Sequence, residues 1–239
     1  MCFVLLGVGT SRLGWRMKSK HSTDDELVYL SLQPAVLTKA DRARLAIVKS
    51  AIVVFAEQGL ENASYARIAT RAKVSRNLII HYFPKKADLF QMCARFVRAD
   101  MQALAVASLG QASRADEMLR KYVRACFIWM ERDPLYNRFW LLVFAVAGQN
   151  EKFRKFHTEL VDVGEARIQK LLEKGIQEKV FRSGPDLRAR AKQIQAIITG
   201  VLTNMFTETT GSFPKDFPSV IENLCLHCAG WEPGSKRLP

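Results

Sequence analysis

Apolar residues recur at three- and four-residue spacing along almost the whole of this 239-residue chain, and no stretch alternates apolar and polar residues as a half-buried strand does. Residues 39–58 show the pattern most clearly, with an apolar face made of Leu45, Val48, Ile52 and Phe55. Thr38 and Asp41 have the spacing of a capping box, and Gly59 stands where a helix stop is expected. The chain is therefore predicted to be all-α, with a first helix at residues 39–58.

The later part of the chain divides into helical segments separated by breaks. Breaks are expected at Gly110, Asp133-Pro134, Gly148, residues 182–185 and residues 211–214. The helices between them are predicted at residues 86–107, 114–132, 135–148, 150–178, 186–210 and 218–230. Residues 1–37 show no sustained period, so we expect a disordered N-terminal extension there and a short tail at residues 231–239.

Two short helices joined by a tight turn follow the first helix. Ser64 is expected to cap a helix at residues 65–72, and Ser75 to cap a second helix at residues 76–83 that Pro84 ends. Two residues, Lys73 and Val74, make the turn between them. Helices this short can bury their apolar sides only by crossing steeply against a third element. The pattern predicts a helix-turn-helix, with its motif at about residues 64–83, on a three-helix platform.

The positive charge of the chain is concentrated around this motif. The whole chain carries a formal net charge of +13, and residues 39–95 contribute eleven Lys and Arg against four Asp and Glu. Residues 96–239 are closer to balance, with 21 basic against 16 acidic residues. Such a block indicates a segment that binds a polyanion beside a segment with another task. On charge alone, a solvated basic face without a partner remains the alternative.

The second short helix has the chemistry to read base edges. A DNA major groove admits one α-helix, and the residues at that helix's N-terminal end contact the bases. Here those residues are Ser75, Arg76 and Asn77, of which Arg76 can pair with guanine and Asn77 with adenine. Ser64, Tyr65 and Lys73 flank them as contacts to phosphate or base edge. A helical hairpin buried in a core fits less well, because both turn-facing ends are polar or basic.

Three segments in this region resemble the N-terminal signature of TetR-family transcriptional regulators: residues 56–60, 68–75 and 81–89. The resemblance implies that Tyr82 and Lys86 grip phosphates and that Lys86 opens the helix leading to a ligand domain. It places Ile80 and His81 on the reading helix, where Ile80 offers an apolar surface to a thymine methyl. Lys73 departs from the family, which usually has Gly at this turn. A left-handed Lys73 costs about 1 kcal/mol, so either Lys73 is tolerated for a phosphate contact or the turn differs slightly from that of the family.

The resemblance also implies an organisation and a mechanism. Residues 38–98 would form the DNA-binding domain and residues 99–230 a helical effector-binding and dimerisation domain. The implied protein is a homodimeric repressor that binds a palindromic double-stranded DNA operator and is released by a small-molecule effector. A helical carrier of apolar small molecules and a non-specific DNA-binding protein are the alternative functions.

Large apolar side chains gather in the middle of the C-terminal half. We expect an effector pocket for an apolar or aromatic molecule, lined by some of Phe127, Met130, Tyr136, Phe139, Trp140 and Phe144, with Arg138 available to orient the ligand. Ordinary helix packing would produce the same spacing, so the alternative for each residue is a place in the core. The segment 186–210 is apolar over a wide arc, and Leu224 adds an apolar residue to the last helix, which favours two-fold pairing.

Several classes of protein fit the sequence poorly. The five cysteines are odd in number, and Cys225 and Cys228 lack the further ligands of a zinc site, so we expect neither a disulfide framework nor a metal site. No nucleophile–base set or phosphate-binding glycine loop appears, which argues against an enzyme and against a cofactor. No stretch has the length and apolar character of a membrane span, and we expect a cytoplasmic protein.

Overall fold

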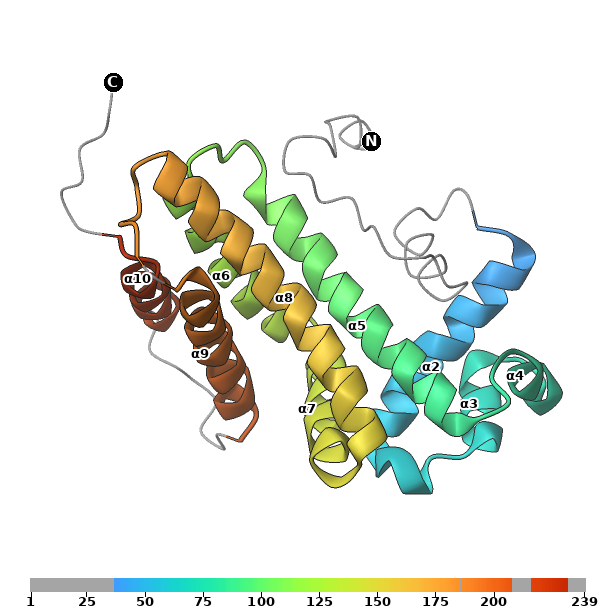
Figure 1. The fold of residues 1–239 in the computed structure, drawn as a ribbon. Helices are drawn as coiled ribbons and strands as arrows, with labels where there is room; N and C mark the ends of the chain where they lie inside the picture. The colour runs from blue at the N-terminus through green and yellow to red at the C-terminus, as the bar shows by residue number, and fades with distance from the viewer. Residues whose placement is uncertain (1–36, 185, 208–215, 232–239) are drawn as a thin grey trace.

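The computed structural model describes residues 37–184, 186–207 and 216–231, and the side chains of residues 206 and 207 are outside that description. The prediction of an all-α chain is confirmed, because no strand occurs in these ranges. The helices, shown in Figure 1, are α2 (Lys39–Asn62), α3 (Tyr65–Ala72), α4 (Arg76–Tyr82), α5 (Lys86–Leu109), α6 (Ala115–Arg132), α7 (Pro134–Gln149), α8 (Glu151–Gln177), α9 (Leu187–Thr207) and α10 (Phe217–Cys228). The expected N-terminal extension lies outside the described residues except for Leu37, which is buried, and the expected tail lies outside them except for Trp231.

Helices α2, α3 and α4 form one end of the molecule. Helix α2 begins with the expected capping box: the Thr38 hydroxyl accepts from the Asp41 N–H at 3.1 Å, and the Asp41 carboxylate accepts from the Thr38 N–H at 3.1 Å. Gly59 interrupts the helical backbone with a φ of 76°, and helical residues resume as far as Asn62. Glycine reaches this φ without the steric cost of a Cβ atom, which explains the kink at this position.

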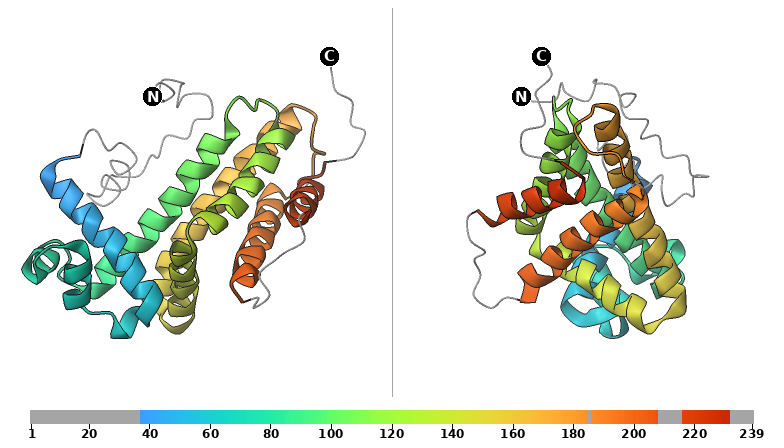
Figure 2. Two further views of the ribbon diagram at one scale, coloured as in Figure 1. Left: turned by 180° about the vertical axis from the view of Figure 1, so that it is seen from behind. Right: turned by 60° about the vertical axis from the view of Figure 1, so that its left-hand side comes forward.

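The remaining helices form an elongated body. Helices α5, α6 and α8 run alongside one another, α7 lies beneath them near α2, and α9 and α10 lie at the far end from α3 and α4 (Figures 1 and 2). The predicted helices of this half all occur, with ends that agree to within two residues where both can be compared. The predicted end at residue 210 and the break at residues 211–214 lie outside the described residues.

An aromatic cluster joins helices α2 to α4, called the head below, to the body formed by α5 to α10. The Phe90 ring of α5 lies 5.3 Å from the Phe55 ring of α2, 5.1 Å from the Phe139 ring of α7 and 5.5 Å from the Phe153 ring of α8, measured between ring centroids. Phe55, Phe90 and Phe139 are fully buried. The pairs of Phe90 with Phe55 and Phe153 are edge-to-face, a geometry that adds to the gain from burying the rings. The two halves of the molecule therefore share one core.

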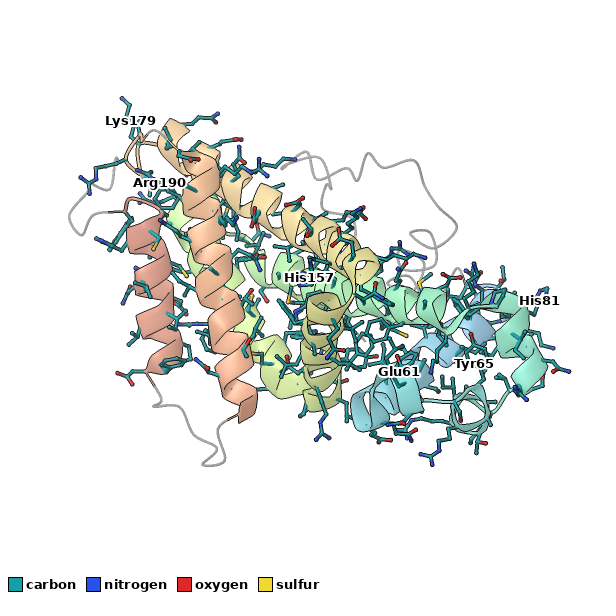
Figure 3. The ribbon with its side chains drawn as sticks, turned by 60° about the horizontal axis from the view of Figure 1, so that its bottom comes forward. Glu61, Tyr65, His81, His157, Lys179 and Arg190 are labelled. Carbon is teal, nitrogen blue, oxygen red and sulfur yellow. The ribbon has the colours of Figure 1, made fainter. Side chains whose placement is uncertain are left out.

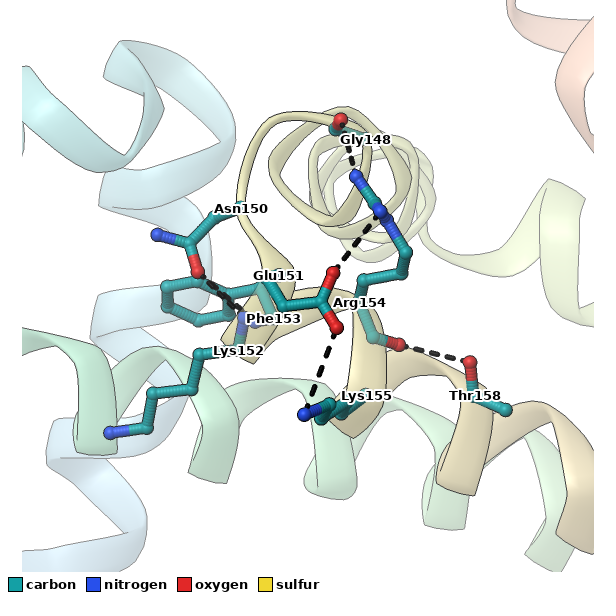
Figure 4. Close-up of polar contacts among 8 residues, drawn as sticks. All are labelled: Gly148, Asn150, Glu151, Lys152, Phe153, Arg154, Lys155 and Thr158. Atoms are coloured by element: carbon teal, nitrogen blue, oxygen red, sulfur yellow. Dashed lines mark hydrogen bonds and ion pairs between the residues drawn. The ribbon is translucent and has the colours of Figure 1, made fainter.

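The start of α8, which carries Phe153 into this cluster, is fixed by polar contacts (Figure 4). The Asn150 side-chain oxygen accepts from the N–H groups of Lys152 at 2.9 Å and Phe153 at 3.3 Å, as an N-cap does. Glu151 pairs with Arg154 at 3.2 Å, and Arg154 also donates to the Gly148 carbonyl at 3.3 Å. The bond from Arg154 to Gly148 connects the first turn of α8 to the last turn of α7.

Candidate nucleic-acid interface and interior cavity

Helix α4 presents one face to solvent and buries the other. Ser75 caps it, with its hydroxyl accepting from the Leu78 N–H at 3.2 Å. Arg76, Asn77, Ile80 and His81 are all exposed, whereas Ile79 is fully buried and Phe83 nearly so. Residues at spacing i, i+1, i+4 and i+5 lie on one side of a helix. The predicted base-reading residues are thus brought together on a face that can enter a groove.

The turn between α3 and α4 has the left-handed residue that the sequence implied. Lys73 has φ 55° and ψ 44°, its N–H donates to the Thr70 carbonyl at 3.3 Å, and the Val74 N–H donates to the Ala69 carbonyl at 3.1 Å. This pair of bonds is the Schellman ending of a helix, in which glycine is the usual left-handed residue. The Lys73 side chain is exposed beside the start of α4. Ser64 caps α3 from the other side, accepting from the Arg67 N–H at 3.3 Å.

Two of the predicted contact residues use their polar groups inside the protein. The Tyr65 hydroxyl donates to the Phe83 carbonyl at 2.6 Å, which ties the start of α3 to the end of α4. The Lys86 ammonium donates to the carbonyls of Glu61 at 2.8 Å and Ala63 at 3.3 Å, where the chain leaves α2. Figure 3 shows Glu61, Tyr65 and His81 at the same end of the molecule. Tyr65 therefore helps to fix α4 against α3, and Lys86 fixes the start of α5 against the end of α2.

Tyr82 is half-buried, and a basic residue covers its ring. The Arg44 guanidinium carbon of α2 lies 5.6 Å from the Tyr82 ring centroid, and the His81 ring centroid lies 5.2 Å from it on the α4 side. A cation over an aromatic face is attracted by the ring's quadrupole. Sequence reasoning did not select Arg44, because its partner comes from a distant part of the chain and no local pattern links the two.

The six residues predicted to line an effector pocket lie in different surroundings. Phe127 packs edge-on against Phe217 of α10, Tyr136 packs against Phe96 of α5, and Phe139 belongs to the aromatic cluster. Met130 is buried on α6. Trp140 and Phe144 line an interior cavity, and Arg138 is exposed on α7 away from it.

The cavity lies where five helices, α5 to α9, meet, and its free volume is about 30 Å³. Trp140, Phe144 and Leu202 form part of its apolar wall. Its polar groups come from Arg98 of α5, Tyr122 of α6, Arg167 of α8 and Gln195 and Thr199 of α9. Sequence reasoning selected neither arginine. Among the lining residues in the described part of the chain, none is Asp or Glu.

Burial changes the pKa values of the groups around this cavity. It lowers the pKa of the Arg167 guanidinium to about 10, an effect opposed by Tyr122 and increased by the positive charge of Arg98. It raises the pKa of the Tyr122 hydroxyl well above its usual value, while Arg167 acts in the opposite direction. Desolvation disfavours a charged group, and a like charge nearby adds to that cost. Burial and the positive charge of Arg98 therefore act on the pKa of Arg167 in the same direction.

Other kinds of site are not found in the described ranges. No group of three or more His, Cys, Asp and Glu residues there is placed to hold a metal ion. Cys93, Cys126 and Cys225 are buried thiols and Cys228 is half-buried. None of the helices described is both long enough and apolar enough to span a bilayer.

Comparisons with known proteins match both halves of the chain. The profile of bacterial regulatory proteins of the TetR family matches residues 47–93, and that of the C-terminal part of BetI-type transcriptional repressors matches residues 115–218. The HTH-type transcriptional regulator BetI of Agrobacterium fabrum is 31% identical over 112 residues, which is 47% of this chain and 54% of that protein. The chain thus aligns with only about half the length of this relative.

Solved structures show the same fold at low sequence identity. The fatty acid degradation regulator FadR of Bacillus halodurans is 20% identical with a TM-score of 0.68, over 80% of this chain and 98% of that chain. A protein of Saccharomonospora viridis described as a transcriptional regulator, in complex with choline, is 23% identical with a TM-score of 0.65, over 77% of this chain and 96% of that chain.

Proposed function

The chain belongs to the TetR family of bacterial regulatory proteins, and we propose that it is a cytoplasmic repressor that binds a palindromic operator as a homodimer and releases it when a small molecule binds. We assign operator binding to residues 38–98 and effector binding and dimerisation to residues 99–230. The observation that carries the proposal is the exposed face of α4, with Arg76 and Asn77 at its N-terminal end. An enzyme is not proposed, since the family consists of regulators.

The DNA contacts are assigned according to what each side chain is free to touch. Arg76 and Asn77 read base edges, Ile80 and His81 contact the groove wall, and Ser64, Ser75, Lys73 and Tyr82 approach phosphates. Tyr65 and Lys86 support the interface from behind, because their polar groups already bind backbone carbonyls. Backbone contacts of this kind give affinity, and base contacts give discrimination.

Two-fold pairing through α9 and α10 is supported by exposed apolar side chains. Val220 and Leu224 of α10 are 53% and 43% exposed, and their i, i+4 spacing puts them on one face of that helix. On α9, Ile194 and Ile198 are buried, whereas Ile197 is partly exposed. The inner part of the apolar arc is thus covered within the subunit and the outer part is available to a second copy. A monomeric mass at micromolar concentration would remove the dimer from the proposal.

The experiment that tests operator reading begins with selection of bound fragments from the source genome. Binding of the selected operator and of a random duplex is then compared for the wild type and for Arg76→Ala. Loss of a bidentate guanine contact should reduce discrimination by about 1–3 kcal/mol. Arg188→Ala, which removes an exposed arginine in the first turn of α9, is the matched control, since α9 lies at the far end of the molecule from α3 and α4. Full discrimination by the Arg76 variant would contradict the assignment.

Release by an effector is the second part of the proposal. We propose that the effector has apolar or aromatic groups and binds in the cavity beside Trp140 and Phe144. Choline in the Saccharomonospora viridis protein supports a small molecule bound within this fold. In the dimer, the two DNA-binding domains must have the spacing of the two operator half-sites. A ligand that binds more tightly to a conformation with another spacing weakens operator binding, and the operator weakens ligand binding by the same factor. A metabolite screen for operator release tests this, and a carrier or a non-specific DNA-binding protein would show no such release.

A further inference from the structure

The short helix α4 is held in place by two neighbouring helices. Of the helices in the described ranges, only α2 and α3 pack against it. From α3, the Tyr65 hydroxyl donates to the Phe83 carbonyl at 2.6 Å, just beyond the end of α4. From α2, the Arg44 guanidinium carbon lies 5.6 Å from the centroid of the Tyr82 ring, in the last turn of α4. A helix of seven residues is not stable by itself, so tertiary contacts of this kind fix its position.

The Arg44 contact reaches the residue of α4 that is assigned to a phosphate. Tyr82 is half-buried, and its ring contacts the Arg44 guanidinium from α2 and the His81 ring within α4. The phenol hydroxyl lies at the tip of this ring, so a group that fixes the ring also fixes the hydroxyl. A guanidinium suits this task because it is planar and is attracted to the face of an aromatic ring.

Helix α2 is itself fixed to the body. Its Phe55 ring lies 5.3 Å from the Phe90 ring of α5 and 6.1 Å from the Phe139 ring of α7, measured between centroids. Arg44 lies eleven residues before Phe55, which is about 16 Å along the axis of α2. Arg44 therefore connects the last turn of α4 to the helix that anchors the head on the body.

We propose that Arg44 is a positioning residue for DNA binding, which holds the Tyr82 ring so that its hydroxyl meets a phosphate of the operator. This inference rests on the proposed function and adds a residue of α2 to the DNA interface. Arg44 acts through Tyr82 and needs no contact of its own with DNA. The strength of a cation–π contact corresponds to a factor of about 2 to 30 in an equilibrium constant, which sets the size of the effect.

The test measures DNA affinity by fluorescence anisotropy over a series of salt concentrations. Arg44→Met removes the charge at similar side-chain length and should weaken binding by about 2- to 30-fold. The loss should be similar for operator and random duplexes, because a phosphate contact carries no sequence information. The slope of log K against log salt concentration should stay close to that of the wild type, because the lost contact is made by a neutral hydroxyl. Arg44→Lys keeps a cation over the ring and should retain part of the affinity.

A double-mutant cycle tests whether Arg44 acts through Tyr82. Tyr82→Phe keeps the ring and removes the hydroxyl. In that background Arg44→Met should cost little further affinity, because no hydroxyl remains to be positioned. Lys49→Met is the matched control, since the Lys49 ammonium of α2 lies 5.9 Å from the centroid of the Phe96 ring of α5. It removes a cation from an aromatic ring elsewhere on α2 and should leave DNA affinity unchanged.

Three results would overturn the positioning role. Wild-type affinity in the Arg44→Met variant would mean that the contact serves the fold alone. A fall in the salt slope of about 0.9 per bound subunit would mean that Arg44 contacts a phosphate itself. Additive losses in the double variant would mean that Arg44 does not act through the Tyr82 hydroxyl. Urea unfolding of each variant ensures that folded proteins are compared, and Arg44→Gln takes the place of Arg44→Met if the latter does not fold.

The same measurements separate this inference from the proposed function. A wild type that prefers the operator, with an Arg44→Met variant that binds it as tightly, would overturn the positioning role and leave the regulator intact. Binding without preference for any sequence, weakened by Arg44→Met at constant salt slope, would overturn the regulator and leave the positioning role intact. Specific binding that Arg44→Met weakens at constant salt slope supports both.

Discussion

Replacing Lys73 by glycine should move stability and DNA affinity in opposite directions. Lys73 is left-handed in a helix ending that favours glycine, and its exposed side chain makes no buried contact. Left-handed backbone costs a residue with a Cβ about 1–2 kcal/mol. Glycine removes this cost but gives the unfolded chain about 0.4–1 kcal/mol more conformational entropy to lose. The Lys73→Gly variant should therefore be more stable by about 0.5–1 kcal/mol.

The same substitution removes a cation beside the proposed DNA face. If each Lys73 neutralises one phosphate, the slope of log K against log salt concentration should fall by about 0.9 per bound subunit. The effect should be similar on the operator and on random duplexes, since a phosphate contact carries no sequence information.

Lys73→Ala is the matched control, because it removes the charge and keeps the left-handed Cβ. Urea unfolding at fixed protein concentration and fluorescence anisotropy over a salt series measure the two effects. Lys73→Ala should show the same fall in the salt slope as Lys73→Gly without gaining stability. If Lys73→Gly is no more stable than Lys73→Ala, the strain argument is wrong. If both variants keep the wild-type salt slope, Lys73 does not contact phosphate.

Three further predictions concern the single residues Lys86, Tyr65 and His157. Lys86→Met should lower the free energy of unfolding by about 1–2 kcal/mol without changing the salt slope, whereas the exposed neighbour in Lys85→Met should leave stability nearly unchanged. Tyr65→Phe should cost about 1 kcal/mol in urea unfolding, because the Phe83 carbonyl loses its donor. Burial lowers the pKa of His157 below its usual 6.5, so the neutral form stabilises the fold above that pH and the contribution is lost as pH falls toward the folded-state pKa. The urea midpoint of His157→Gln should consequently drop less between pH 7 and pH 5 than that of the wild type, and equal drops would refute the assignment.

The head could be predicted closely because its signals are local. Thr38, Ser64 and Ser75 each accept a hydrogen bond from the backbone N–H three residues ahead. The capping residue and its partner are therefore close in the sequence, and a short pattern reveals both. Gly59 likewise marks the kink in α2 through its own backbone freedom. The roles of Tyr65 and Lys86 could not be predicted in this way. Their partners are carbonyls elsewhere in the head, and a family signature does not distinguish a residue that touches DNA from one that holds a helix.

The cavity was less predictable, because the helical period of the sequence shows which residues share a face of a helix but not which other helix packs against that face. Phe139 and Trp140 are adjacent and about 100° apart around α7. Phe139 faces α2 and α5 in the aromatic cluster, while Trp140 faces the cavity. Only tertiary packing decides between these surroundings. One signal was present for the missed arginines: Arg98 and Arg167 each stand directly beside a buried apolar residue, Val97 and Ile168, at the edge of an apolar face.

The shared core limits how the two halves can move. The proposed boundary between residues 98 and 99 falls inside α5, a continuous helix that holds both Arg98 and the Phe90 ring. Phe90 contacts rings from α2, α7 and α8. A shift of α5 therefore changes the packing against all three helices. Close-packed interiors respond to such shifts by changing between discrete arrangements. A ligand that shifts α5 is therefore expected to select between discrete packings of the Phe90 cluster, and the difference in its affinity for them would limit the change in operator affinity.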